Sequence, residues 1–130
     1  MKDALVTIRN SRNGMPRKMA VLSNKPVNPS RAIVEALGLG EFFVSGVYGG
    51  NSFASKKPDP EGAQTILRDA GAQPKETLMV GDSAVDVTTG QNAGLWTCAV
   101  TYGFAPHTLD AANPDVTLDS PRDLADLFAV

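Results

Sequence analysis

Short apolar runs alternate along this chain with segments of helix-like apolar spacing, and glycine or proline separates most of them. The runs at 18–22, 42–48, 77–80, 96–100 and 116–118 predict strands, and helices are predicted at 2–12, 28–37, 60–70, 84–93 and 121–128. Continuous apolar strands that alternate with amphipathic helices are typical of a parallel sheet covered on both faces. We therefore expect an α/β fold, a three-layer sandwich around a parallel sheet.

Two of the helices carry a recognisable start signal. Asn28 precedes Pro29, and Asp59 precedes Pro60, which is the pattern of an N-cap residue followed by a proline in the first turn. Gly71 follows the second of these helices as an expected terminator. We expect Asn28 and Asp59 to be the capping residues.

The composition indicates one ordered domain and excludes several classes of protein. With 130 residues, 42% of them hydrophobic, and a net charge of −2, we expect a single domain over residues 1–130 and no disordered chain. The balance of 12 basic and 14 acidic residues argues against nucleic-acid or anionic-membrane partners. No apolar run reaches the ~20 residues of a membrane span, and no secretory signal opens the sequence. The lone Cys98 is expected to be a buried structural thiol, and the expected compartment is the cytoplasm.

Chemically useful side chains follow the predicted strands. Ser23 and Asn24 come directly after the first strand, Lys57 lies before a helix, and Asp82 and Asp86 follow a third strand. In an open parallel sheet, ligands bind at the carboxyl ends of the strands, so we expect these groups to converge there. A hydroxyl and an ammonium suit phosphate oxygens, and carboxylates suit a hard divalent cation. The pattern predicts a site for phosphate and Mg²⁺.

Each of these signals also has an ordinary structural interpretation. Taken alone, Asp82 and Ser83 could cap the following helix, Lys56 and Lys57 could be a solvated pair, and Ser23 could belong to a plain turn. A receiver domain of a response regulator is a weaker alternative, because it needs its acidic cluster early and its lysine late. The three signals in this order favour the phosphate site.

The order of the motifs is similar to that of the haloacid dehalogenase superfamily. Ser23 after an apolar strand, Lys57-Pro58 before a helix, and the stretch from Gly81 to Asp86 after another strand match that order. The segments at 21–26, 56–60 and 101–103 resemble the phosphoglycolate phosphatase branch, and the resemblance extends over the chain from residue 18 onward. The implied fold is a Rossmann-like core.

The resemblance implies a role for each matching residue. Ser23 would hydrogen-bond the transferring phosphoryl group, with Asn24 beside it, and Lys57 would hold both the nucleophile and the phosphate. Asp82 would bind Mg²⁺, and Asp86 would be an outer-shell or water-mediated acid. The implied reaction is Mg²⁺-dependent hydrolysis of a small phosphate monoester, a phosphorylated metabolite, through an aspartyl-phosphate.

The family's first motif, Asp-x-Asp-x-Thr, has no counterpart in this sequence. No Asp-x-Asp occurs at all, and only 22 residues precede Ser23. The chain therefore resembles the C-terminal part of such an enzyme, without the nucleophile strand and without the cap domain. We expect it to be inactive as given. The alternative is a non-catalytic module for phosphate or metal binding or for oligomerisation.

The resemblance implies that the missing strand would lie between the strand ending at Ser23 and the strand ending at Asp82. Its loss would leave unpaired edges, and buried unpaired groups cost ~1–3 kcal/mol each. Three arrangements could satisfy the edges: direct pairing of the two strands, insertion of residues 4–8 as a surrogate strand, or a homodimer through the gap. We expect direct pairing or the homodimer, because residues 2–12 have a helical pattern.

Overall fold

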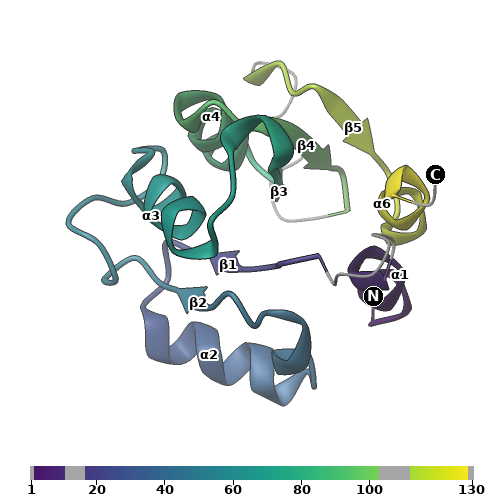
Figure 1. Ribbon diagram of the computed structural model, residues 1–130, viewed down its shortest axis with the longest axis horizontal. Coiled ribbons are helices and arrows are strands. Elements are labelled where there is room, and N and C mark those ends of the chain that lie inside the picture. The colour runs from purple at the N-terminus through teal and green to yellow at the C-terminus, as the bar shows by residue number, and fades with distance from the viewer. Residues whose placement is uncertain (1, 11–16, 103–111, 129–130) are drawn as a thin grey trace. The chain divides into compact units, whose positions relative to one another are not determined.

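The computed structural model describes residues 2–10, 17–102 and 112–128, and it has an α/β fold with parallel strands (Figure 1). The chain divides into two compact units, Met1–Ala54 with Pro121–Val130, and Ser55–Ser120. The strands form two sheets, one in each unit. The expected α/β class with parallel strands is confirmed. A single domain over residues 1–130 stays a prediction.

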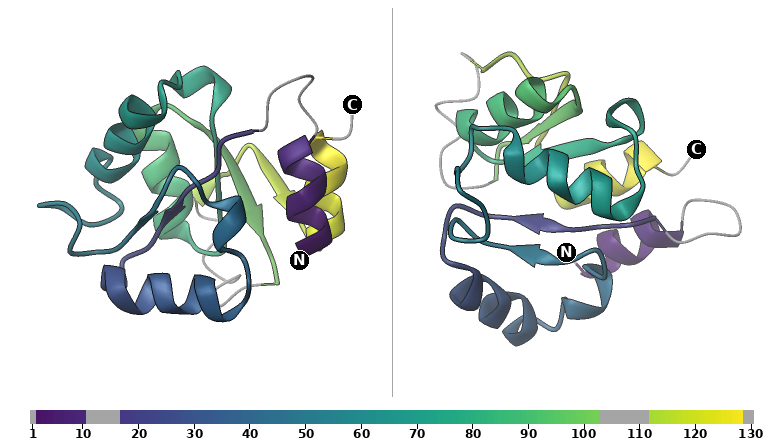
Figure 2. Two further views of the ribbon diagram at one scale, coloured as in Figure 1. Left: turned by 60° about the horizontal axis from the view of Figure 1, so that its bottom comes forward. Right: turned by 60° about the vertical axis from the view of Figure 1, so that its left-hand side comes forward.

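The first unit holds a two-stranded parallel sheet. Strand β1 (Val21–Leu22) pairs with β2 (Val47–Tyr48), so that Val21 lies opposite Val47. Helix α2 (Val27–Ala36) packs on β2. Helix α1 (Lys2–Asn10) lies beside α6 (Pro121–Phe128), as Figure 2 shows, and also contacts the 3₁₀ helix η1 (Gly40–Phe42).

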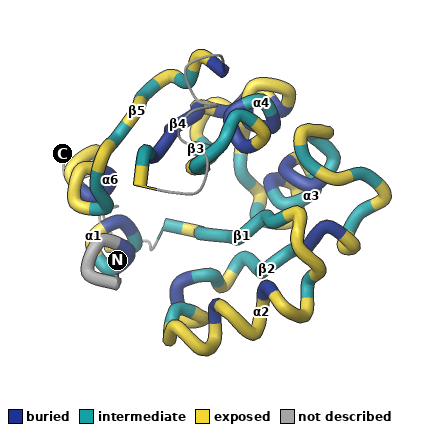
Figure 3. Tube along the Cα trace, turned by 180° about the vertical axis from the view of Figure 1, so that it is seen from behind, coloured by how far each residue is buried: buried dark blue, intermediate teal, exposed yellow. Residues whose placement is uncertain are grey.

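The second unit holds a three-stranded parallel sheet in the order β3-β4-β5. Its strands are β3 (Leu78–Gly81), β4 (Trp96–Val100) and β5 (Val116–Leu118). Helix α4 (Ala84–Ala93) packs on β3 and β4, α3 (Glu61–Ala70) packs on α4, and a 3₁₀ helix, η2 (Pro74–Glu76), precedes β3. The continuous buried stretch of β4 is visible in Figure 3.

The N-cap prediction is wrong for α2, and in α3 the N-cap position is occupied by Pro60 rather than by Asp59. Asp59 accepts the backbone N–H of Glu61 at 2.9 Å, and Gly71 follows the last residue of α3. Helix α2, however, begins at Val27, so Asn28 lies inside its first turn and is not the N-cap. The reason is that the Val27 N–H donates to the side chain of Asn51, 24 residues further on, at 2.8 Å.

The strand predicted at 42–48 is wrong in its first half. Phe42 belongs to η1, and only Val47–Tyr48 forms a strand. Phe42 is 1% exposed and packs under the guanidinium of Arg9, whose carbon lies 4.8 Å from the ring centroid. Phe42 is therefore buried as part of a 3₁₀ helix and not as part of a strand. The strand predicted at 18–22 is also shorter than expected, since β1 extends only over Val21–Leu22, although Met19 and Ser23 each make one further backbone bond to the neighbouring segment.

Direct pairing of the two strands that flank the missing one stays a prediction, because β1 and β3 belong to different units. Within the units, β1 pairs with β2 and β3 pairs with β4. Residues 4–8 are helical, as their pattern predicts, with Leu5 and Ile8 buried. The homodimer through the gap stays a prediction.

Within the described ranges, no helix combines the length and the apolar character needed to cross a bilayer.

The burial of Cys98 leads to a prediction about its reactivity. The residue is 0% exposed in the middle of β4, and burial raises the pKa of its thiol to about 11. Because the thiolate is the reactive form, the native chain should react very slowly with Ellman's reagent between pH 7 and 9. Unfolding in guanidinium chloride should release one rapidly reacting thiol, since Cys98 is the only cysteine. Rapid reaction of the native chain would contradict the buried position.

Candidate functional site

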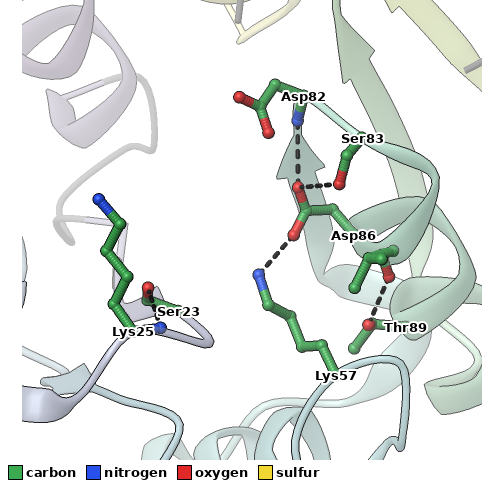
Figure 4. Close-up of polar contacts among 8 residues, drawn as sticks. Ser23, Lys25, Lys57, Asp82, Ser83, Asp86 and Thr89 are labelled. Atoms are coloured by element: carbon green, nitrogen blue, oxygen red, sulfur yellow. Dashed lines mark hydrogen bonds and ion pairs between the residues drawn. The ribbon is translucent and has the colours of Figure 1, made fainter. Parts of the chain in front are cut away.

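An ion pair joins the turn that precedes α3 to the first turn of α4. The ammonium of Lys57 lies 2.5 Å from Oδ1 of Asp86, and the two side chains are each 11% exposed (Figure 4). Charges this well removed from water attract each other more strongly than charges on the surface. The pair therefore fixes the ammonium of Lys57 at a defined position.

The carboxylate of Asp86 also holds the loop that leaves β3. Its Oδ2 accepts the backbone N–H of Asp82 at 3.1 Å and the hydroxyl of Ser83 at 3.4 Å. Ser83 occupies the N-cap position of α4, but its side chain makes no capping bond and donates to Asp86 instead. An acidic residue in the first turn is also favoured by the helix dipole. Asp86 thus connects the lysine, the loop and the helix.

Gly81 gives Asp86 the space for these contacts. A Cβ built on Gly81 would lie 2.0 Å from Cβ of Asp86 and 2.4 Å from its Oδ2. No side chain can occupy that volume unless Asp86 moves. The glycine at the end of β3 is therefore a condition for the position of the carboxylate.

A second bond fixes the backbone next to Lys57. Asn92, near the end of α4, donates its side-chain N–H to the carbonyl of Pro58 at 2.9 Å. The chain around Lys57 is thus held by α4 at two points, Asp86 and Asn92. The sequence analysis missed Asn92, because a polar residue on a helix gives no sign that it reaches a backbone carbonyl 34 residues away.

Ser23 and Asn24 lie in the other unit, directly after β1. The backbone N–H of Ser23 donates to the carbonyl of Tyr48 at 3.0 Å, which continues the β1–β2 ladder. Its hydroxyl oxygen accepts the backbone N–H of Lys25 at 3.0 Å (Figure 4). A hydroxyl that accepts through one lone pair keeps its hydrogen for another acceptor. Ser23 is therefore suited to donate a hydrogen bond to an anion.

The structure thus brings together Lys57, Asp82 and Asp86, while Ser23 and Asn24 belong to the other unit. The roles predicted for these five residues stay predictions.

The side chains of this site could offer Mg²⁺ one carboxylate ligand. Figure 4 shows the carboxylate of Asp82 directed away from that of Asp86, whose two oxygens accept hydrogen bonds from Lys57, Asp82 and Ser83. No three His, Cys, Asp or Glu side chains form a metal-binding group in the part of the chain that the structure describes. Mg²⁺ commonly uses one or two carboxylates, with water and phosphate as its other ligands. Asp82 meets that requirement.

The ion pair predicts a difference between two adjacent lysines. Replacement of Asp86 by Ala should lower the free energy of unfolding by about 3 kcal/mol, because it removes the carboxylate that balances the largely buried charge of Lys57. Lys57→Met should be similarly destabilising, and Lys56→Met, at an exposed position, should change stability by less than about 0.5 kcal/mol. Urea unfolding followed by circular dichroism measures all three. Equal effects of the two lysine substitutions would contradict the assignment.

The contact between Gly81 and Asp86 predicts a second difference. Gly81→Ala should cost about 2 kcal/mol or more, because the new Cβ must displace the Asp86 carboxylate. Gly40→Ala is the matched control, since a Cβ there meets nothing within 4 Å, and it should be close to neutral. Thermal unfolding of both variants tests this. A neutral Gly81→Ala would show that Asp86 does not need its observed position.

The fold and motifs have clear relatives. Residues 3–94 match the family model for haloacid dehalogenase-like hydrolases. A phosphoglycolate phosphatase of Vibrio parahaemolyticus is 36% identical over 113 residues, which is 86% of this chain and 49% of that enzyme. One of Aquifex aeolicus is 36% identical over 111 residues, which is 85% of this chain and 51% of that enzyme. The chain spans about half the length of the curated relatives it matches.

Solved structures agree with this assignment. The crystal structure of a predicted phosphoglycolate phosphatase from Haemophilus somnus is 28% identical and superposes with a TM-score of 0.87, covering 97% of this chain and 54% of that one. The matched segment contains the ordered motifs at Ser23, Lys57 and Gly81-Asp82-Ser83. The chain therefore belongs to the haloacid dehalogenase-like hydrolases.

Proposed function

We propose that this chain carries the phosphate-binding part of a phosphatase of the phosphoglycolate phosphatase type. The observation that carries the proposal is the Lys57–Asp86 pair beside the Gly81-Asp82-Ser83 loop. The fixed ammonium of a lysine can bind phosphate oxygens, and a carboxylate in the neighbouring loop can hold the Mg²⁺ that accompanies the phosphate. The similarity to phosphoglycolate phosphatases supports the same choice.

Lys57 and Ser23 have complementary roles in this proposal. Phosphoryl transfer depends mainly on positioning and on neutralising the charge on the phosphoryl oxygens. The ammonium of Lys57 supplies positive charge, and the hydroxyl of Ser23 donates a hydrogen bond, with Asn24 as a further polar contact. Asp86 acts through Lys57 and through the Asp82 backbone, so it is a positioning residue.

Mg²⁺ is the proposed cofactor, and Asp82 would hold it. When bound, the ion would neutralise charge on the phosphate. Asp86 holds the backbone N–H of Asp82, so it would also influence the position of the Asp82 carboxylate. Stability and metal binding would be linked through the same acidic side chain.

The nucleophile is the group that this sequence lacks. The resemblance implies attack by an aspartate from an Asp-x-Asp-x-Thr motif, and no Asp-x-Asp occurs in these 130 residues. A reaction through a covalent intermediate cannot proceed with the charge-stabilising groups alone. We therefore propose that the chain as given does not hydrolyse a phosphate monoester, and that a small phosphorylated metabolite is the substrate once a nucleophile segment is supplied.

Activity assays test the need for the nucleophile. The purified chain should show no significant Mg²⁺-dependent hydrolysis of p-nitrophenyl phosphate or phosphoglycolate. Addition of the part of the Vibrio parahaemolyticus enzyme that lies outside the match, which the resemblance implies would carry the Asp-x-Asp-x-Thr strand, should give measurable turnover that Lys57→Gln abolishes. Turnover by the chain alone that copurifies with it and disappears in Asp82→Asn would contradict the proposal of inactivity.

A non-catalytic phosphate-binding module is the second candidate, and the absence of Asp-x-Asp favours it. The reconstitution separates the two. A chain that binds inorganic phosphate through Lys57, yet gives no turnover with a nucleophile segment that is shown to associate, would be the binding module. A chain that does not bind inorganic phosphate would contradict both candidates.

A further inference from the structure

A tight turn at residues 49–52 lies against the segment that carries Ser23. We call residues 23–27 the Ser23 loop and residues 49–52 the glycine turn. The backbone N–H of Gly50 donates to the carbonyl of Lys25 at 2.7 Å, and the N–H of Val27 donates to Oδ1 of Asn51 at 2.8 Å. The strand residue just before the turn, Tyr48, accepts the N–H of Ser23. The loop is thus bonded at its start, middle and end to one continuous stretch of chain.

Asn51 supplies what the beginning of α2 lacks. The first N–H groups of a helix have no acceptor within the helix and normally use a side chain at the N-cap. Here the N-cap residue is Pro26, which has no side-chain acceptor, and no local capping bond is made. The side-chain amide oxygen of Asn51, Oδ1, accepts the first N–H of α2 instead. The cap comes from the glycine turn.

The backbone of the turn fits closely against the same point. A Cβ on Gly49 would lie 2.2 Å from the Val27 nitrogen and 2.5 Å from its Cα, so only glycine allows this approach. The turn is itself held, because Ser52 accepts the N–H of Gly49 at 2.9 Å. The rings of Tyr48 and Phe53, which flank the turn in the sequence, stack with centroids 5.5 Å apart. These contacts hold the glycine turn, and with it Asn51, in one conformation.

We propose that Asn51 is a positioning residue for the Ser23 loop. By fixing the N–H of Val27 it sets the end of the loop, and Gly50 sets its middle, so that Ser23 and Asn24 are presented in one geometry. The proposal rests on the proposed function in one respect, namely that the loop binds phosphate. Asn51 itself touches no substrate in this account and acts through the backbone.

Amide hydrogen exchange tests the geometric part without any ligand. In Asn51→Ala, exchange at Val27 should be about five- to tenfold faster, and the amide resonances of Ser23 and Lys25 should shift, because one end of the loop is released. Asn51→Asp keeps an acceptor oxygen at the same place and should restore both. Glu76→Ala is the matched control, since it removes an equally exposed 2.8 Å bond, from the Gln73 N–H, in the other unit.

Titration with inorganic phosphate, followed by the same amide resonances, tests the functional part. Asn51→Ala should weaken phosphate binding about fivefold or more, while Glu76→Ala should leave it unchanged. Equal phosphate affinity in the wild type and Asn51→Ala would overturn the proposal, as would an unaltered Val27 exchange rate. If the wild type itself does not bind phosphate, the proposed function fails, and the exchange data alone then decide whether Asn51 positions the loop.

Gly49→Ala provides an independent variant. Its Cβ would push Val27 away while leaving the Asn51 side chain intact. It should produce the same shifts at Ser23 and Lys25, provided that circular dichroism shows a folded chain. A folded Gly49→Ala with an unchanged Ser23 loop would contradict the close approach on which the proposal depends.

Discussion

The Lys57–Asp86 ion pair is the interaction on which the organisation of the second unit depends. Removing two charges from water is costly, and the attraction between them repays the cost only when further hydrogen bonds complete the arrangement. Here the second carboxylate oxygen of Asp86 accepts from the Asp82 backbone and from Ser83, so the charge is well compensated. One carboxylate thereby couples the lysine, the loop after β3 and the start of α4.

The same arrangement gives Asp82 and Asp86 different surroundings. Asp86 is surrounded by donors and is directed inward, whereas the carboxylate of Asp82 is directed away from it (Figure 4). Two carboxylates four positions apart in sequence could both be metal ligands in principle. The donors around Asp86 engage both of its carboxylate oxygens, and we propose that Asp82 is the residue that would hold the ion. Because Gly81 has no side chain, Asp86 has room for its observed position.

The sequence predicts those parts of the fold that depend on residues close together in the chain. The side chain of Asp59 accepts the backbone N–H of Glu61, two residues away, at the start of α3, and the apolar run in β4 predicts a buried strand at its observed place. Phe42 could not be placed, because its burial depends on Arg9 and on a turn that periodicity does not reveal. The three site motifs were found from their order, but the separate sheets of β1 and β3 follow from pairing between distant segments.

The residues that hold the motifs were harder to find than the motifs themselves. Asn92 reaches Pro58 over 34 positions, and Asn51 reaches Val27 over 24. Each side chain makes a single hydrogen bond to the backbone. A backbone N–H or carbonyl can pair with any residue type that places a suitable atom at the right distance. A motif requires particular side chains at particular positions. A residue that only bonds to a backbone group needs to place one suitable atom within reach of it. The geometry of a loop such as 23–27 is therefore set in part by residues whose identity carries no signal in the sequence.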